Sequence, residues 1–306
     1  MELVKGYFFA LLSAVLLGLM AVLVKIVLNM GLTTLGVIFL RFSFSSLFLA
    51  VFLKARGISF RLNQEQFFIL LGVGIVGYGL MNLCYYGAFL LIPVGLTSMI
   101  HYIYPVVVVL MARILYRSRF PKSVYAALVL GMAGAMILSF SDLGKMNLFG
   151  VLLAFLAGIC YGIYVVFMDH PKIRDLHGLV IVFYLSAFSA LFSLLFAPFA
   201  GGLPWHGLDP KILLLMLIVS LFCTVFALFL FREAVVRIGS THTTILSTME
   251  PVSAAVLGVI ILDEKVGLGM LIGSVLILSA VMIVTMARKD SSSADNVGEV
   301  EEMDPS

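Results

Sequence analysis

The sequence predicts an all-α integral membrane protein with ten transmembrane helices, arranged as two inverted repeats of five helices each. Three observations predict this fold class. The 306-residue chain is 62% hydrophobic and only 11% charged, and its mean hydropathy is +1.18, whereas soluble domains carry roughly 25% charged residues. Its apolar runs are long enough to cross a bilayer, which takes about 20 residues. The second half of the chain also repeats the pattern of the first.

Apolar runs bounded by charged or turn residues define the ten predicted spans. They lie at 6–28, 33–53, 66–89, 94–115, 123–140, 148–168, 179–199, 211–234, 240–262 and 267–287. The runs lack a period of two and are too long for barrel strands, which favours helices. The first run is longer than a signal-peptide core and is followed by further spans, so we interpret it as a membrane helix. Residues 288–306 are acidic and predict a disordered cytoplasmic tail.

The basic residues are distributed unequally between the two sides of the predicted bundle. If the N-terminus is cytoplasmic, twelve Lys and Arg residues fall in inner segments, and only Lys145, Lys211 and Lys265 fall in outer loops. Cytoplasmic loops of membrane proteins carry the excess of Lys and Arg. We therefore expect a multi-pass protein of the cell membrane with both termini in the cytoplasm.

The internal repeat divides the chain into residues 5–140 and 148–287. A shift of 144 residues aligns residues 6–25 with 150–169, and Gly18 is one of five residues that then meet an identical residue. Because each unit holds five helices, the second unit must enter the membrane in the opposite orientation. Inverted repeats of this kind are typical of secondary transporters, which are expected to bind a small-molecule substrate within the bilayer.

Glu250 is the acidic residue placed deepest in a predicted span. It lies ten residues into the span 240–262, about 15 Å from its end at 1.5 Å per residue. An ionised carboxylate at that depth is costly, so it must be neutral, paired or facing a wet cavity. It either contacts substrate or exchanges a proton with it, or it only bonds a neighbouring helix; the sequence leaves these alternatives open.

Three further residues are candidates for coupling or gating. Pro105 and Pro251 occupy matching positions near the middle of a span in each half. Proline frees a backbone carbonyl one turn back, so the two either interrupt their helices at a central site or form ordinary kinks. Arg41 is the deepest basic residue, and it either extends along its helix to the membrane surface or pairs with Glu250 or an anionic substrate group.

Polar and aromatic side chains at the same depth are the candidate substrate-binding residues. Each pair shares one helix face through a spacing of three or four. The set comprises Tyr78 and Asn82, His101 and Tyr104, Tyr161 and Tyr164, and Ser247 with Glu250. They fit a site that accepts a ring or an amine through stacking and cation–π contacts. Hydrogen bonding between helices, without a ligand, is the competing interpretation.

Several chemical classes find no support in the sequence. The run Gly72–Gly77 fits G-x-G-x-x-G, but it lies inside a membrane span and no strand precedes it, so helix packing is the better interpretation. No zinc motif, phosphate loop or nucleophile set is present. We therefore expect no enzyme activity, no cofactor, no metal and no nucleic-acid partner. The small-residue stretches fit contacts within the bundle and a homodimer equally well.

The ten-helix repeat resembles the drug/metabolite transporter superfamily, and specifically its EamA-type branch. The resemblance covers about residues 5–288 and is most specific at Met249-Glu250-Pro251-Val252, Gly258 and Leu262-Asp263-Glu264-Lys265. The first half departs from it, with Tyr104 where the second half has Glu250. The resemblance implies alternating access, often export, of a small metabolite or amino acid, with proton coupling in question because the acid is single. A scaffold or sensor built on the same bundle is the alternative function.

Overall fold

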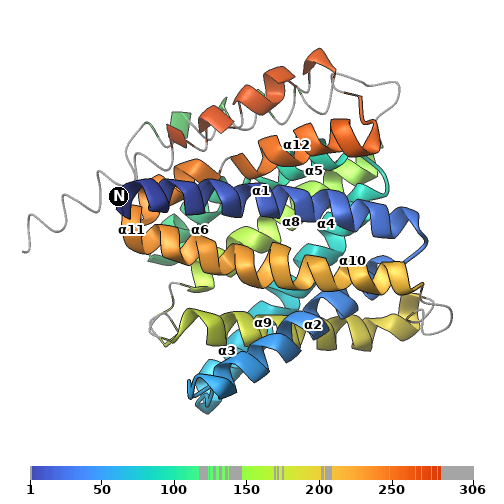
Figure 1. Cartoon of the computed structure of the whole chain (residues 1–306). Coiled ribbons are helices and arrows are strands. Elements are labelled where there is room, and N and C mark those ends of the chain that lie inside the picture. The colour runs from blue at the N-terminus through green and yellow to red at the C-terminus, as the bar shows by residue number, and fades with distance from the viewer. Residues whose placement is uncertain are drawn as a thin grey trace, which may run out of the picture.

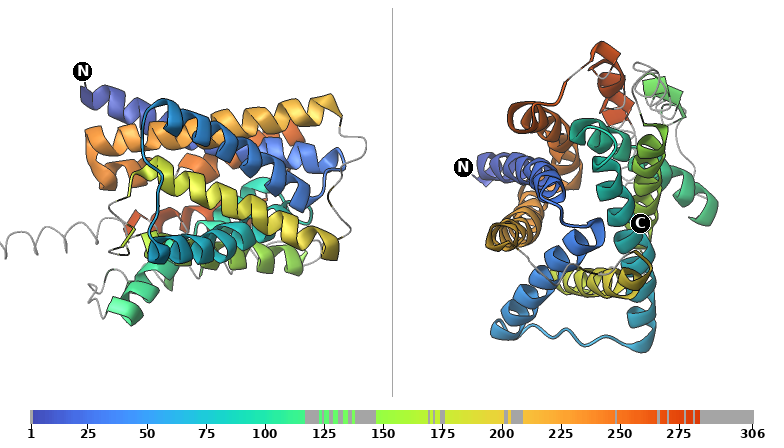
Figure 2. Two further views of the ribbon diagram at one scale, coloured as in Figure 1. Left: turned by 90° about the horizontal axis from the view of Figure 1, so that it is seen from below. Right: turned by 90° about the vertical axis from the view of Figure 1, so that its right-hand side faces the viewer.

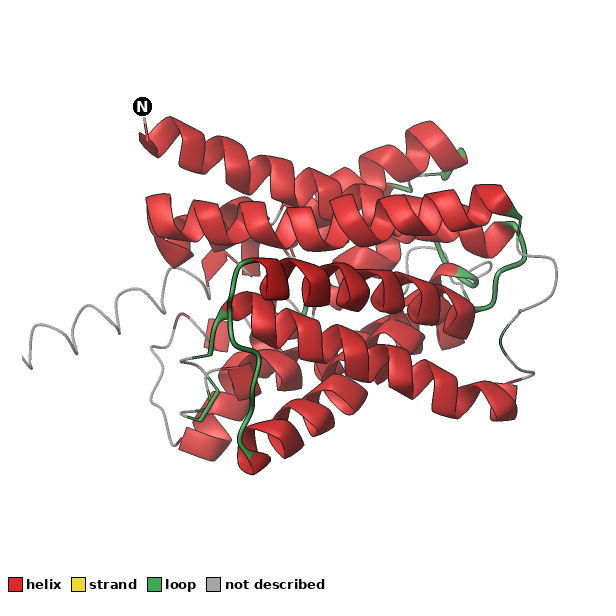
Figure 3. Ribbon diagram, turned by 60° about the horizontal axis from the view of Figure 1, so that its bottom comes forward, coloured by secondary structure: helices red, strands yellow, loops and turns green. Residues whose placement is uncertain are grey.

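The computed structural model describes residues 2–116 and 147–283, together with isolated residues of 123–137. Gaps in the second range fall at 169, 171, 174–175, 201–202, 204–208, 248, 266, 270, 277 and 281. The described part is a bundle of helices joined by loops, without strands, as Figure 3 shows. The all-helical prediction is therefore confirmed for these residues. Most of the predicted span 123–140, and the whole tail 288–306, lie outside the described residues.

Six helices of the described part are long and apolar enough to cross a membrane, and three shorter apolar helices accompany them. The long helices run roughly parallel or antiparallel to one another and are seen nearly end-on in the right-hand view of Figure 2. Large apolar side chains face outward, for example Val51, which is 63% exposed, and Ile260, which is 69% exposed. Such outward-facing apolar surface fits a hydrocarbon solvent and not water.

The first half of the chain supplies six α-helical segments to the described bundle. These are α1 (Glu2–Asn29), α2 (Thr34–Ala55), α3 (Gln64–Gly72), α4 (Met81–Phe89), α5 (Val94–His101) and α6 (Tyr104–Tyr116). A π-helix, η1 (Val73–Leu80), joins α3 to α4 without a break, so residues 64–89 form one candidate span. The predicted spans 6–28, 33–53 and 66–89 correspond to these helices to within a few residues.

The second half supplies seven further elements, which precede the short apolar helix Leu271–Ala280. These are α8 (Leu148–Met168), α9 (Gly178–Phe196), the 3₁₀ turn η2 (Ala197–Ala200), α10 (Pro210–Ser220), the π-helix η3 (Leu221–Phe226), α11 (Ala227–Ser247) and α12 (Met249–Leu262). Helix α11 crosses the gap that the sequence placed between spans 211–234 and 240–262. Figure 1 shows the chain running along α10 and α11 and returning along α12.

Contacts along α1 locate this reversal of the chain. The Ser13 hydroxyl donates to the Ala227 carbonyl at 2.8 Å, Gly6 lies against Ile238, and Gly18 lies against Glu250. Helix α1 is therefore antiparallel to the start of α11 and parallel to α12. The chain turns between Ile238 and Glu250 while most of its backbone stays helical, which explains why the predicted boundary differs from the observed one.

Local sequence signals start and end several of these helices. Asn63 and Gln66 form a capping box at the start of α3, in which each side chain accepts from the other residue's backbone N–H. Asp209 caps α10 through the Lys211 N–H, and Pro210 follows at a helix position that has no need of an N–H. Gly31 and Gly57, after α1 and α2, adopt φ of +97° and +65°, which side chains rarely tolerate.

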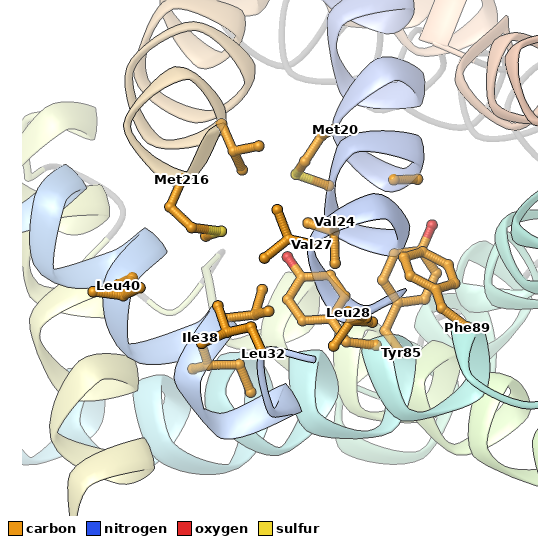
Figure 4. Close-up of a cluster of buried hydrophobic side chains, with 14 of the residues drawn as sticks. Met20, Val24, Val27, Leu28, Leu32, Ile38, Leu40, Tyr85, Phe89 and Met216 are labelled. Carbon is orange, nitrogen blue, oxygen red and sulfur yellow. The ribbon is translucent and has the colours of Figure 1, made fainter. Parts of the chain in front are cut away.

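The largest apolar cluster joins helices of both halves. Val24 and Val27 of α1, Ile38 of α2, Phe89 of α4 and Met216 of α10 are all buried in it, and Figure 4 shows several of its side chains meeting between these helices. Lipid is as apolar as these side chains, so their association in a membrane depends on close packing. The cluster therefore holds α1 and α2 against elements 50 to 180 residues away in the sequence.

Residues separated by a constant offset make matching contacts in the two halves. The Ser45 hydroxyl donates to the Ser220 carbonyl at 3.3 Å, and the Ser189 hydroxyl donates to the Gly74 carbonyl at 3.3 Å. Ser189 follows Ser45 by 144 residues, and Ser220 follows Gly74 by 146. The π-helices η1 and η3 also occupy matching positions. The same positions of both halves thus support the same interactions.

Polar contacts lie at both ends of the bundle. Glu2 of α1 pairs with Arg237 of α11 at 3.2 Å, and Glu65 of α3 pairs with Lys172. Elsewhere, the Glu264 carboxylate accepts from the Val94 N–H at the start of α5 at 2.8 Å, and it interacts electrostatically with Lys25 of α1. The sequence placed Lys172 and Arg237 in inner segments and Lys25 within the predicted span 6–28, and the orientation of the bundle stays a prediction.

Candidate functional site

The helix that carries Pro105 is interrupted just before it, and Pro251 lies near the described start of α12. Helix α5 ends at His101 and α6 begins at Tyr104, so Pro105 is the second residue of a new helix. In the second half α11 is described to Ser247 and α12 from Met249, with Pro251 as its third described residue, and residue 248 between them lies outside the described residues. The helix start at Tyr104 suits Pro105, because proline is favoured where its missing N–H would have no partner in the helix.

A glycine of a neighbouring helix packs closely against the beginning of α6 and another against the beginning of α12. A Cβ added to Gly162 of α8 would lie 2.7 Å from Val107 Cβ and 3.3 Å from the Tyr104 carbonyl oxygen. A Cβ added to Gly18 of α1 would lie 2.7 Å from Ser253 Cβ and 2.9 Å from the Glu250 carbonyl oxygen. Glycine thus lets α8 approach the beginning of α6, and α1 approach the beginning of α12.

The glycine-rich run predicted to serve helix packing does so at two of its glycines. Gly74 and Gly77 lie in η1, and an added Cβ would come within 2.7 Å of Phe188 Cβ and 2.9 Å of Tyr164 Cβ, respectively. Gly72 has no atom within 4 Å of that position. The packing interpretation of this motif is confirmed for Gly74 and Gly77 and is wrong for Gly72.

Five of the predicted substrate-binding residues form one chain of aromatic contacts. The Tyr78 ring lies 5.3 Å from the Tyr164 ring, which lies 5.2 Å from the Tyr161 ring, measured between centroids. Tyr161 in turn lies 4.7 Å from Tyr104 and 5.2 Å from His101. These side chains come from η1, α5, α6 and α8, so the break between α5 and α6 places two of them in the group.

His101 is buried within this aromatic group. It is 8% exposed, and its ring centroid lies 4.7 Å from that of Tyr85, whose hydroxyl is hydrogen-bonded to Ser98. Its Nδ1 atom has no hydrogen-bond partner among the described residues. Buried polar atoms are almost always bonded, so this nitrogen marks a position where a ligand or water is expected.

Arg41 of α2 turns into the bundle. It is 4% exposed, which excludes the alternative in which its side chain extends to the membrane surface. Its Nε donates to the Thr224 hydroxyl of η3 at 3.0 Å, and its Nη1 donates to the side-chain oxygen Oδ1 of Asn82 at 3.3 Å and to the Tyr86 hydroxyl. The guanidinium also lies 4.8 Å from the Phe42 ring centroid.

Glu250 lies near the same residues on the opposite half of the chain. Its side chain is partly exposed, and it interacts electrostatically with Arg41, Tyr78 and Tyr85. Within the described residues no hydrogen bond or ion pair engages the Glu250 carboxylate, so its direct pairing with Arg41 is not observed. The centre of the bundle therefore holds a carboxylate and a guanidinium that are close but not joined.

The two remaining predicted residues are occupied within the protein. The Asn82 side chain donates to the Tyr78 carbonyl at 2.8 Å and accepts from Arg41, so it orients the guanidinium. The Ser247 hydroxyl donates to the Thr243 carbonyl at 3.0 Å within its own helix. These contacts give Asn82 and Ser247 structural partners, while the predicted substrate contacts of both residues stay predictions.

Three residues of the site were missed by sequence reasoning: Tyr85, Tyr86 and Thr224. Tyr86 follows Asn82 by four residues and therefore shares its helix face, which was a usable signal. Thr224 is a polar residue inside an apolar run, but nothing in the sequence connects it to Arg41, 183 residues earlier. Its role follows only from the packing of η3 against α2.

Comparison with known proteins identifies the family. The sequence profile of the EamA-like transporter family matches residues 4–140 and again residues 148–286. The chain belongs to the EamA-like transporter family. The two matches correspond to the two halves of the chain, and family membership makes the protein a multi-pass membrane transporter of small molecules.

Curated relatives of this transporter include exporters. It is 29% identical over 263 residues to the threonine/homoserine exporter RhtA of Escherichia coli K12, an alignment that covers 84% of this chain and 83% of the relative. It is 28% identical over 235 residues to RhtA of Salmonella typhimurium LT2, covering 75% and 74%. A solved crystal structure shares the fold with a TM-score of 0.63 at 18% identity, covering 94% of this chain and 97% of that one.

Proposed function

We propose that this protein is a secondary transporter of the cell membrane that exports small amino-group-bearing metabolites, amino acids foremost, by alternating access. The observation that carries the proposal is the Glu250 carboxylate, which interacts electrostatically with Tyr78, Tyr104 and Tyr161 of the aromatic group and has no ion-pair partner within the described residues. A carboxylate held among aromatic rings attracts an ammonium group through charge and cation–π contacts. The curated relatives that are named as amino-acid exporters support the direction and the substrate class.

The proposed mechanism treats the two halves as inverted five-helix repeats that move against each other around the midplane. The matching hydrogen bonds of Ser45 and Ser189 support the repeat, as do the two profile matches. Helix α6 begins just before Pro105, and Pro251 occupies the matching position of the second half, so we propose that these two positions take part in gating. Cytoplasmic termini, proton coupling and a homodimer stay predictions.

Counterflow in proteoliposomes tests the proposal. Vesicles that contain the purified protein and are loaded with unlabelled L-threonine should take up labelled threonine, whereas empty vesicles should not. The Glu250→Gln variant should lose at least tenfold of this uptake while keeping its melting temperature, and the exposed Glu65→Gln variant should retain it. A scaffold or sensor predicts no counterflow by the unaltered protein, and normal counterflow by Glu250→Gln would contradict the role of the carboxylate.

A further inference from the structure

We propose that Arg41 binds the carboxylate of the transported ligand while Glu250 binds its ammonium group, so that the substrate is a zwitterionic α-amino acid. The inference rests on the proposed function and narrows its substrate class. An amine would need only Glu250, and an organic acid would need only Arg41. The argument depends on the surroundings of both charges.

The Arg41 guanidinium is a buried cation that no anionic group of the described residues contacts. The side chain is 4% exposed, and its three hydrogen-bond partners, Thr224, Asn82 and Tyr86, are neutral. A buried charge is costly unless an opposite charge compensates for it. Glu250 interacts with it electrostatically but forms no ion pair with it. An anionic group of a ligand that binds between Arg41 and Glu250 would therefore compensate the charge of the guanidinium.

The hydrogen bonds of Arg41 leave part of its guanidinium available. The group carries five N–H donors in a planar fork, and the observed bonds use only Nε and Nη1. No described residue accepts from Nη2. Thr224 and Asn82, from opposite halves of the chain, hold the fork in one orientation. A guanidinium fixed in this way suits a carboxylate, to which its geometry is matched.

The two charges share the same neighbours. Tyr78 and Tyr85 each interact electrostatically with both Arg41 and Glu250, so one small region of the bundle borders both charged groups. An α-amino acid presents an ammonium and a carboxylate on one carbon and would compensate both charges at once. The Phe42 ring lies 4.8 Å from the guanidinium, and its centroid is 5.4 Å from that of Tyr78.

The competing explanation is that Arg41 only ties α2 to α4 and η3. In that case removing the carboxylate from a ligand should not affect its binding, although removing Arg41 should still destabilise the protein. The two explanations therefore separate in the response to ligand charge, and stability alone does not distinguish them.

Calorimetric binding to the purified full-length protein provides the test, with three probes. These are L-threonine, L-threoninol, which lacks the carboxylate, and 3-hydroxybutyrate, which lacks the ammonium group. We expect threoninol and 3-hydroxybutyrate each to bind about 10- to 100-fold more weakly than threonine, the range that follows from losing a charge-assisted hydrogen bond. Equal binding of threonine and threoninol would overturn the inference and leave the transporter proposal standing. Binding of none of the three would overturn both.

Variants assign each charge to its residue. Arg41→Gln should bind threonine no more tightly than threoninol, and its affinity for threoninol should stay near that of the unaltered protein. Glu250→Gln should lose the preference over 3-hydroxybutyrate in the same way. Arg41→Lys keeps the positive charge but lacks the planar guanidinium, and it replaces Arg41→Gln in the test if that variant does not fold. It should retain only part of the preference for threonine over threoninol. A full preference for threonine in both Arg41 variants would overturn the assignment.

Discussion

Substitution of Gly18 tests the packing of α1 against α12. An added methyl group would lie 2.7 Å from Ser253 Cβ, 2.8 Å from the Ala254 nitrogen and 2.9 Å from the Glu250 carbonyl oxygen. Favourable contacts between carbon atoms lie at about 3.5–4.0 Å, so α12 must move by close to an ångström. The neighbouring atoms belong largely to the backbone and cannot rotate out of the way.

The free-energy change of Gly18→Ala is the sum of two opposing effects. Overpacking a close interface costs about 1–3 kcal/mol, whereas replacing glycine by alanine in a helix contributes about 1 kcal/mol of stability. Gly72→Ala is the matched control, because Gly72 is helical and no atom lies within 4 Å of the added methyl group. The difference between the two variants should therefore be about 1–3 kcal/mol, since the helix-propensity gain cancels.

Reversible unfolding in mixed detergent micelles measures this difference. Gly162→Ala should behave like Gly18→Ala, because its methyl group would lie 2.7 Å from Val107 Cβ. Gly18→Ala should also weaken threonine binding, since it displaces the backbone that carries Glu250. A Gly18→Ala variant as stable as Gly72→Ala would refute the reasoning, because it would show that α12 can move at no cost.

Two further predictions concern hydrogen bonds between distant segments. Glu264→Ala removes the charged acceptor at the start of α5 and should lower the free energy of unfolding by about 1 kcal/mol. The control Glu65→Ala, at an exposed residue, should change it by less than about 0.5 kcal/mol. Equal losses in the two variants would argue against a capping role for Glu264. Ser45→Ala and Ser189→Ala each remove one of the matched bonds and should each cost about 0.6 kcal/mol in the same unfolding assay. Ser46→Ala is their control, because the Ser46 hydroxyl donates to the Ser43 carbonyl of its own helix. If Ser46→Ala lowered the free energy of unfolding by the same amount, the matched bonds would have no special role in joining the helices.

Helix positions were predictable because lipid imposes a single strong constraint on the sequence. A spanning segment must satisfy its backbone internally and be apolar over about 20 residues, so residues 6–28 identified the helix Glu2–Asn29 directly. Pro105 likewise indicated the interruption between His101 and Tyr104, since a proline cannot continue the hydrogen bonding of the preceding turn. An interruption before Pro251 stays a prediction, because residue 248 lies outside the described residues. The aromatic contacts around Tyr161 agree with the sequence prediction, which placed the aromatic residues at one depth in the membrane and paired them by helix face.

Tertiary contacts decided the features that could not be predicted. The direction of the Arg41 side chain depends on Thr224, a residue in the other half of the chain, so the sequence near Arg41 fits both orientations. The reversal between Ile238 and Glu250 overlaps the boundary predicted between the spans 211–234 and 240–262, but the backbone stays helical to Ser247, so the bounds of the two helices did not follow from the sequence. The π-helices η1 and η3 leave no signal in composition, because they differ from α-helices only in the spacing of backbone hydrogen bonds.

The bond between Glu264 and the Val94 N–H has a consequence for the resting state of the transporter. Two identical inverted halves would make the inward-open and outward-open states equal in free energy, so each would be half populated. The halves differ here, because the position that matches Glu264 is Ser118, a neutral residue. A difference of about 1 kcal/mol between the two closures shifts a two-state population by about fivefold. Under the proposed alternating access, the Glu264 carboxylate would therefore favour the closed state in which it holds α5, and so bias the side of the membrane that the empty protein faces.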